Sequence, residues 1–376
     1  MNCVIIAKNF QCKEVDAVSK KFFAVMIVAV LMLTARIAAA VPVDWSKAPR
    51  IGTKAELARF VEGERRNGET TFCVVLTNGL KTEDHKEFLS LAPAPHVDIS
   101  WTYRGDGTAY VTYRIKEYPG TRVANAYLCG NTDWLSRDEL KLYDIAVGIV
   151  DEAKKFSSPA DKERYIYEAV CKRATFYSED NMKNLPNFVT AIGALVDGRA
   201  NCQGYADAFY MLGRMCGLNV GRIIGNDDTH AWNWIELGGK VYCVDVTKGD
   251  TLVDGVTSYV YFNAPLEIMR GEHVWEWELM PAFQEKIDGR YAYRTIDGLE
   301  RASSAEDGLK LIAQRFAANE KVVRVMTSFD ERFSEANVQH AADYVVDELN
   351  ARNCAVTFTV NVFECGDYLF LTGVID

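Results

Sequence analysis

The chain has 376 residues, of which 49% are hydrophobic and 25% are charged, and its formal net charge is −10. This composition is typical of a globular protein and unlike that of a disordered chain, and the length suggests two or three domains. An acidic surface repels phosphate backbones, so we expect no nucleic acid partner.

The first forty residues are organised like a secretory signal. Lys20 and Lys21 precede an apolar run at 22–35, and Ala38-Ala39-Ala40 follow it. Positive charge, a short apolar stretch and small residues at a cleavage point are typical of a signal peptide. We expect residues 1–40 to be removed, no stable membrane span afterwards, and a secreted or cell-envelope protein. The alternative is an uncleaved anchor, although the run is short for a membrane span.

Residues 41–132 predict a small α/β module. Apolar periodicity favours helices at 53–66 and 82–91, and β-branched residues favour a strand at 70–77. Strands at 97–103 and 108–115 form a hairpin that turns at Arg104-Gly105-Asp106-Gly107.

The C-terminal residues 299–376 repeat this order of elements. The pattern predicts a helix, a strand, a second helix and two strands, at 305–317, 321–328, 334–351, 355–363 and 368–375. We interpret the two ends as a duplicated small α/β module that flanks a central domain at residues 133–298. That domain opens with helices at 136–156 and 160–173, and Asp161 is the expected cap of the second helix.

Eight of the ten cysteines follow the signal segment. Export would permit disulfides, but a sequence does not give their pairing, and Cys73 with Cys129 is one candidate pair across a sheet. No C-x-x-C spacing occurs, so a structural zinc site has little support.

Cys202 lies at the predicted start of a helix. Gly198 and Asn201 interrupt regular structure, an amphipathic pattern follows, and Gly217 ends it. The positive end of the helix dipole favours a negative charge, so a thiol there becomes a better nucleophile.

A second segment, THAWNWIELGGKVYCVDVT, predicts a hairpin that turns at Gly238-Gly239. A two-residue turn pairs Leu237 with Lys240, and the same register places His230 and Asp245 on one face as diagonal neighbours. A one-residue slip would place them on opposite faces.

Together these residues supply a nucleophile, a base and an orienting acid. His230 would take the proton of Cys202, and Asp245 would fix the tautomer of the imidazole. The backbone N–H of Gln203 could serve the oxyanion, with Tyr177 as an alternative donor. Trp232 could wall the cleft, although a buried sheet aromatic is the commoner role. His273 is expected to be a surface or packing residue, unless it lines the cleft.

The stretches AIGALVDGRANCQGYADAF, HAWNWIEL and VYCVDVT resemble, in order, three motifs of the bacterial transglutaminase-like superfamily. The resemblance covers roughly residues 135–275. It implies an α+β, papain-like core, with Cys202 as nucleophile, His230 as base and Asp245 as orienting acid. Many relatives carry Trp-Asp after the third motif, whereas this chain has Lys248-Gly249-Asp250.

The resemblance implies a cysteine enzyme that acts on amide bonds through an acyl-thioester at Cys202, with no metal or organic cofactor. Hydrolysis is favoured over amine transfer, and peptides, proteins or cell-envelope polymers are the expected substrates. The alternative is a non-catalytic cell-envelope binding or scaffold protein that retains the fold, which the duplicated modules would suit. A third hypothesis makes Cys202 and His230 metal ligands.

Overall fold

A computed structural model describes residues 44–67, 69–80, 96–177, 187–225, 230–250, 256–280, 282–287, 291 and 298–375. The predicted signal segment 1–40 and the predicted helix at 82–91 lie outside these residues. No helix within the described ranges combines the length and the hydropathy needed to cross a membrane. The described residues have the predicted α+β fold, with helices packed on antiparallel sheets.

The N-terminal part is a four-stranded sheet with a helix packed on it. Its elements are β1 (Arg50–Ile51), α2 (Lys54–Arg66), β2 (Thr71–Leu76), β3 (His96–Tyr103) and β4 (Ala109–Lys116). The strand order is β1-β2-β4-β3, with only β1 and β2 parallel. Thr53 caps α2 and exchanges hydrogen bonds with Glu56, which fixes where the helix begins.

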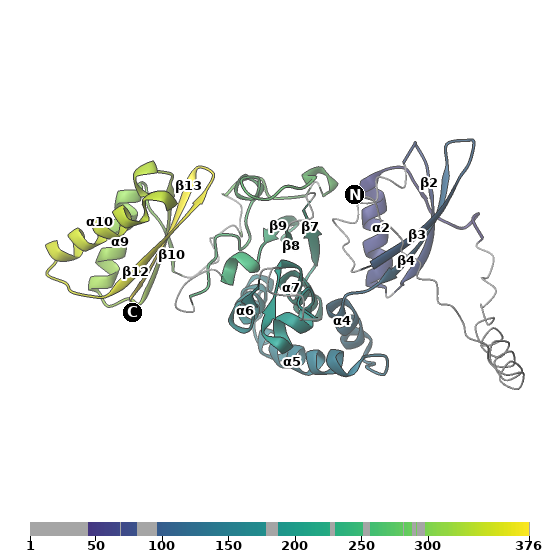
Figure 1. Cartoon of the computed structure of the whole chain (residues 1–376), viewed down its shortest axis with the longest axis horizontal. Coiled ribbons are helices and arrows are strands. Elements are labelled where there is room, and N and C mark those ends of the chain that lie inside the picture. Colours follow the sequence, from purple (N-terminus) through teal and green to yellow (C-terminus); the bar gives the residue numbers. More distant parts are fainter. Residues whose placement is uncertain are drawn as a thin grey trace, which may run out of the picture. The chain divides into compact units, whose positions relative to one another are not determined.

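The C-terminal part has the same topology. Its elements are β10 (Leu299–Arg301), α9 (Ala305–Ala317), β11 (Val322–Ser328), α10 (Val338–Ala351), β12 (Phe358–Cys365) and β13 (Tyr368–Ile375). The strand order is β10-β11-β13-β12, again with the short first strand parallel to its neighbour. Figure 1 shows α9 and α10 on one side of this sheet, where Leu309 and Val345 share a core with Leu371.

The predicted order of elements is therefore confirmed at both ends for the described residues. The short strands β1 and β10 were not predicted, because two or three residues show no periodicity. Helix α10 begins four residues later than predicted, since 3₁₀ turns at Glu331–Phe333 and Glu335–Asn337 precede it. The predicted boundaries at 41–132, 133–298 and 299–376 stay predictions.

The central part combines helices with a three-stranded antiparallel sheet in the order β7-β8-β9. The helices are α4 (Pro119–Cys129), α5 (Arg137–Ala153), α6 (Pro159–Arg173), α7 (Cys202–Met215) and α8 (Leu266–Met269), with a π-helical turn at Gly193–Asp197 and 3₁₀ turns at Thr247–Asp250 and Trp277–Leu279. The strands are β5 (Thr175–Phe176), β6 (Arg199–Ala200), β7 (Val220–Ile224), β8 (Ala231–Leu237) and β9 (Lys240–Val244).

Helix α7 is the centre of this part. It packs against α4, α5 and α6 and against strands β7 and β8, as Figure 1 shows. Nearly every side chain of α7 is buried, as expected of a helix surrounded by protein. Helix α4 was not predicted, and its contact with α7 joins the chain that follows β4 to the central core.

The starts of α5 and α6 differ from one another. Ser136 caps α5 and exchanges hydrogen bonds with Glu139. The expected cap of α6 at Asp161 is wrong, because Ser158 is the N-cap residue and Pro159 opens the helix. Asp161 lies in the first turn instead, where the helix dipole favours its charge.

The hairpin of β8 and β9 has the predicted register. Leu237 pairs with Lys240, and Trp234 pairs with Cys243. Gly238 and Gly239 have φ angles of 58° and 80°, the left-handed conformations that a type I′ turn needs at both positions. The turn residues therefore fix which side chains of the two strands share a face.

The eight cysteines of the described residues are free thiols. The candidate pair Cys73 and Cys129 is wrong, because Cys73 lies 3.3 Å from the hydroxyl of Thr112 on the neighbouring strand and Cys129 is exposed at the end of α4.

Candidate active site

Cys202 is the first residue of α7, as predicted, because Asn201 caps the helix. Asn201 has an extended backbone, and its Oδ1 accepts hydrogen bonds from the amides of Gln203 (3.1 Å) and Gly204 (3.3 Å). Asparagine is among the best N-cap residues, because its side chain satisfies amides that have no partner within the helix. Cys202 therefore lies at the positive end of the helix dipole, beside amides that have no partner within the helix.

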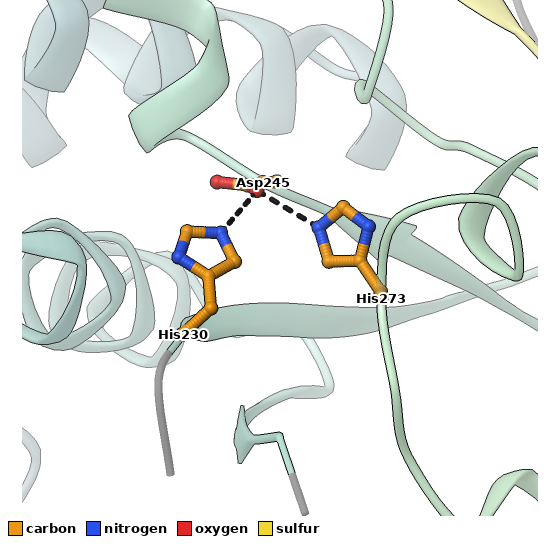
Figure 2. Close-up of side chains that lie close together, drawn as sticks. All are labelled: His230, Asp245 and His273. Atoms are coloured by element: carbon orange, nitrogen blue, oxygen red, sulfur yellow. Dashed lines mark hydrogen bonds and ion pairs between the residues drawn. The ribbon is translucent and has the colours of Figure 1, made fainter. Parts of the chain in front are cut away.

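His230 and Asp245 meet at the end of the central hairpin. His230 directly precedes β8 and Asp245 directly follows β9, so the register brings their side chains to one face. Nε2 of His230 lies 2.6 Å from Oδ2 of Asp245, as Figure 2 shows. Asp245 is fully buried, whereas 26% of the His230 side chain is exposed. The diagonal relationship expected from the sequence is confirmed.

The surroundings of His230 favour its charged form. Burial alone would lower the pKa of His230, but the negative charge and hydrogen bond of Asp245, together with a hydrogen bond to Cys202, raise it to about 10. Since Nε2 faces Asp245, Nδ1 is the atom available to the sulfur. The Asp245 carboxyl has a pKa well below its usual range, because His230 and His273 outweigh the effect of burial. The site therefore favours an imidazolium beside the ionised carboxylate of Asp245.

His273 is a further residue of the site, and no sequence motif points to it. Its Nε2 lies 3.0 Å from the same Oδ2 of Asp245, and only 4% of the residue is exposed. It lies four residues after α8, in a segment without regular structure. His273 is buried, as expected of a packing residue, but it also forms this hydrogen bond with Asp245. No local pattern around residue 273 indicates that bond.

Trp232 is the residue that backs the imidazole of His230. The two rings stack with centroids 5.9 Å apart and planes 27° apart, and Trp232 is 1% exposed. Its ring also meets His273 edge-on at 4.8 Å. Trp232 therefore supports both imidazoles from behind and does not line an open cleft.

The two candidate oxyanion residues have other contacts. The N–H of Gln203 donates to Oδ1 of Asn201, whereas Cys202, as the first residue of α7, offers its own amide at the same helix start. The side-chain oxygen of Gln203 accepts from the hydroxyl of Tyr118 at 3.5 Å. Tyr177 follows β5, where Arg199 lies over its ring at 5.4 Å. Among the described residues, no hydrogen bond joins Tyr177 to Cys202.

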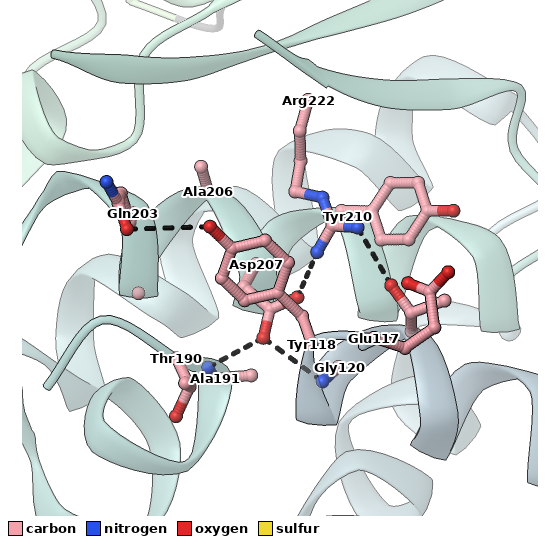
Figure 3. Close-up of polar contacts among 12 residues, drawn as sticks. Glu117, Tyr118, Gly120, Thr190, Ala191, Gln203, Ala206, Asp207, Tyr210 and Arg222 are labelled. Atoms are coloured by element: carbon pink, nitrogen blue, oxygen red, sulfur yellow. Dashed lines mark hydrogen bonds and ion pairs between the residues drawn. The ribbon is translucent and has the colours of Figure 1, made fainter. Parts of the chain in front are cut away.

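A buried ion pair fixes α7 one turn below the nucleophile. Asp207 pairs with Arg222 of β7, and its Oδ2 accepts from the amides of Gly120 (3.0 Å) and Ala191 (2.9 Å), as Figure 3 shows. Arg222 also donates to the hydroxyl of Thr121 at 2.8 Å. Asp207 thereby ties α7 to α4, to β7 and to the segment before Cys202. A charged residue among the buried apolar positions of the helix is the signal that could have indicated it.

Three side chains of the site could hold a metal ion. The ligand atoms of His230, Asp245 and His273 all lie within 4.8 Å of one another. Two imidazoles and a carboxylate are ligands that zinc accepts. The N···O distances of 2.6 Å and 3.0 Å are also normal hydrogen bonds, so the same residues satisfy one another directly.

The central part of the chain is similar to a known protein family. Residues 147–246 match the family model described as the Transglutaminase-like superfamily. No curated protein matches the chain. The matched range includes Cys202, His230 and Asp245 and ends one residue after the last of them.

Three solved structures are similar to the chain at low identity. A TGase is 16% identical, with a TM-score of 0.27, and the match covers 50% of this chain and 54% of that one. A putative cysteine protease from Cytophaga hutchinsonii is 14% identical, with a TM-score of 0.22 and coverages of 41% and 63%. A putative protease from Parabacteroides distasonis is 9% identical, with a TM-score of 0.24 and coverages of 81% and 65%. This chain thus covers less than two thirds of each of these structures.

Proposed function

We propose that residues 147–246, a core of the transglutaminase-like superfamily, carry a cysteine enzyme that acts on amide bonds of peptides or proteins through an acyl-thioester at Cys202. The observation that carries the proposal is the hydrogen-bonded pair of His230 and Asp245, 2.6 Å apart, beside a cysteine at a helix start. A nucleophile, a base and a group that orients the base form the arrangement used for acyl transfer on unrelated folds.

The reaction follows from these positions. The sulfur of Cys202 attacks the amide carbonyl carbon and forms a C–S bond, while the carbonyl oxygen takes the negative charge near the amide of Cys202. The C–N bond then breaks, and His230 gives its proton to the leaving nitrogen. Asp245 keeps Nε2 of His230 occupied throughout, so Nδ1 stays directed at the reacting atoms.

The acyl-thioester then reacts with an acceptor. Water, activated by the neutral imidazole of His230, would release a carboxylic acid and restore the thiol, which makes the enzyme a peptidase or amidase. An amine would form a new amide instead. Hydrolysis is the favoured proposal, because Cys202 is only 9% exposed and packs against Ala206 and Ala231. Water is the smallest acceptor, so it reaches a thioester at this buried position more easily than an amine does.

The substrate and the location are proposals that rest on the sequence. The apolar run at 22–35, after Lys20 and Lys21, supports export to the cell envelope or beyond. Peptides, proteins and cell-envelope polymers carry the amide bonds that such an enzyme would meet there. The acidic composition supports a substrate other than nucleic acid.

The first test compares two cysteines of one molecule. Cys129 is exposed and Cys202 is buried, so accessibility alone predicts that Cys129 reacts first with iodoacetamide. The proposal predicts the reverse near neutral pH, because only a thiolate beside an imidazolium is a strong nucleophile. Peptide mass spectrometry over a time course measures both rates. Faster modification of Cys129 would favour the non-catalytic scaffold instead.

A second test separates the two acceptors. Wild type and Cys202→Ala are incubated with denatured casein, with and without a fluorescent primary amine. New peptide termini or deamidated side chains that require Cys202 indicate hydrolysis, and covalent fluorescence that requires Cys202 indicates amine transfer. Activity that survives in Cys202→Ala would contradict the proposed nucleophile, and loss of activity with a chelator would favour the metal hypothesis.

A further inference from the structure

His273 is enclosed within the protein beside the proposed catalytic residues. Its ring lies 4.8 Å from the ring of Trp232, 5.1 Å from that of Tyr261 and 5.4 Å from that of His230, measured between centroids. The side chain is 1% exposed. Figure 2 shows it reaching Asp245 from the side opposite to His230. Packing on several sides holds the ring in one orientation, with Nε2 directed at the carboxylate.

Asp245 needs this contact because it has few other donors. Its side chain is fully buried, so its oxygens depend on protein groups for hydrogen bonds. Oδ2 accepts from His230 (2.6 Å) and His273 (3.0 Å), while Oδ1 accepts from the amide of Lys248 at 3.3 Å. Among the described residues, His273 is thus the short second contact of the carboxylate, and the amide is a long third one.

The hydrogen positions of the two rings follow from these contacts. Both Nε2 atoms must carry hydrogen to donate to Oδ2. Nδ1 of His273 has no hydrogen-bond partner among the described residues, so a second proton there would be buried without an acceptor. The Nε2–H of His273 can donate to Asp245 whether His230 is charged or neutral.

We propose that His273 is a positioning residue of the reaction: its Nε2–H holds the Asp245 carboxylate in place, so that Asp245 can keep the imidazole of His230 directed at Cys202. The inference rests on the proposed function and adds a fourth residue to it. Without His273, the carboxylate could turn about its bond to Cβ and break the 2.6 Å contact with His230. Tyr261, whose ring lies 5.1 Å from that of His273, and the carboxylate of Glu272 are further polar residues beside it.

The test uses three substitutions, of which Gln and Met are matched in shape. His273→Gln keeps an N–H donor near the position of Nε2, and His273→Met has nearly the same shape as glutamine but no donor. His273→Phe keeps an aromatic ring against Trp232 and Tyr261 and also lacks a donor. Iodoacetamide modification of Cys202 is followed by peptide mass spectrometry from acid to alkaline pH in the full chain, with Cys129 as the internal reference.

The donor decides the expected result. Since a hydrogen bond to a charged group is worth about tenfold or more in an equilibrium, Met and Phe should slow modification of Cys202 near neutral pH by about tenfold. In the Met and Phe variants, the rise of the Cys202 modification rate on the acid side of the pH profile (the acid limb) should also move to higher pH. The Gln variant should stay close to wild type. A merely structural role would lower the melting temperature but leave the limb in place.

Two results would overturn the inference. One is a wild-type rate profile in both Met and Phe variants, and the other is an equal loss in the Gln, Met and Phe variants. Failure of the proposed function looks different, because wild-type Cys202 would then react no faster than Cys129. The two donor-free variants differ in shape, so a folding defect in one leaves the other to decide.

Discussion

Nε2 of His230 lies 2.6 Å from Oδ2 of Asp245, although 15 positions separate the two residues in the sequence and neither lies within a strand. The two-glycine turn and the ladder it closes bring them together, and the ladder ends before either residue. Their side chains are therefore positioned by regular structure but lie just beyond it, where the imidazole can still face the sulfur.

Asp245→Asn should separate the effect of the Asp245 charge from the effect of its shape. The amide has nearly the same size as the carboxylate but no charge, so it cannot favour the imidazolium of His230. We expect modification of Cys202 by iodoacetamide near neutral pH to fall by about 10- to 100-fold, since each pKa unit lost by His230 is a factor of ten. Rates of Cys202 and Cys129 in the same sample measure the effect. An unchanged ratio would contradict the role of Asp245.

The stability of the protein should depend on the charge of His230. Its pKa is raised from 6.5 to about 10 in the folded state, so the charged form contributes stability that is fully present below pH 6.5. That contribution is lost as the pH rises through about 10. Urea unfolding of wild type should therefore show a steeper fall in stability over this range than His230→Gln. Parallel curves for the two proteins would mean that the raised pKa is absent.

How much of the site the sequence predicts depends on how local each signal is. Asn201, Gly217 and the two glycines at 238–239 act within a few residues, so the helix start and the hairpin register could be predicted. His273 acts through a contact with Asp245, which is 28 positions away. The side chain of a residue in an irregular segment is directed by tertiary packing, which no periodicity encodes.

In the fold, too, elements with a strong local signal could be predicted and elements without one could not. Elements with a strong apolar period, such as α9, were predicted with the observed bounds, Ala305–Ala317. Helix α4 was missed, because Pro119, Gly120 and Thr121 at its start read as a break in regular structure. Those residues form the first turn, where a proline costs no hydrogen bond and the amide of Gly120 is used by Asp207.

Substitutions at Asn201 should separate the effect of helix capping on stability from the effect of charge on the reactivity of Cys202. Asn201→Ala removes the acceptor for the amides of Gln203 and Gly204 and should cost about 1 kcal/mol of stability. Asn201→Asp keeps the cap, so stability should stay near wild type. Its negative charge next to Cys202 should disfavour the thiolate and slow iodoacetamide modification. Equal stability of the Ala and Asp variants in urea unfolding would contradict this account.

Two glycine-to-alanine changes should have opposite signs. A Cβ at Gly204 would lie 2.8 Å from the carbonyl oxygen of Phe188 and 2.9 Å from that of Thr190, so the start of α7 would have to move. We expect a loss of about 1–3 kcal/mol and slower modification of Cys202. Gly148 in α5 has no atom within 4 Å of the same position, so Gly148→Ala should stabilise the helix by about 0.5–1 kcal/mol. Denaturant unfolding measures both, and two changes of the same sign would refute the steric argument.

The buried ion pair below the nucleophile should dominate the stability of the core. Asp207→Ala leaves Arg222 buried without its anion, together with two amides without their acceptor. The expected loss is about 3–5 kcal/mol in the free energy of unfolding. Asp207→Asn combined with Arg222→Met removes both charges, so it should be less destabilised than Asp207→Ala.

An exposed pair gives the control for this prediction. Asp138 and Lys141 are 2.7 Å apart, and both side chains are more than half exposed. Asp138→Ala should therefore leave the free energy of unfolding close to that of wild type. Stability of Asp207→Ala close to that of Asp138→Ala would show that water reaches Arg222. In that case the tie between α7, α4 and β7 would contribute little to holding Cys202 in place.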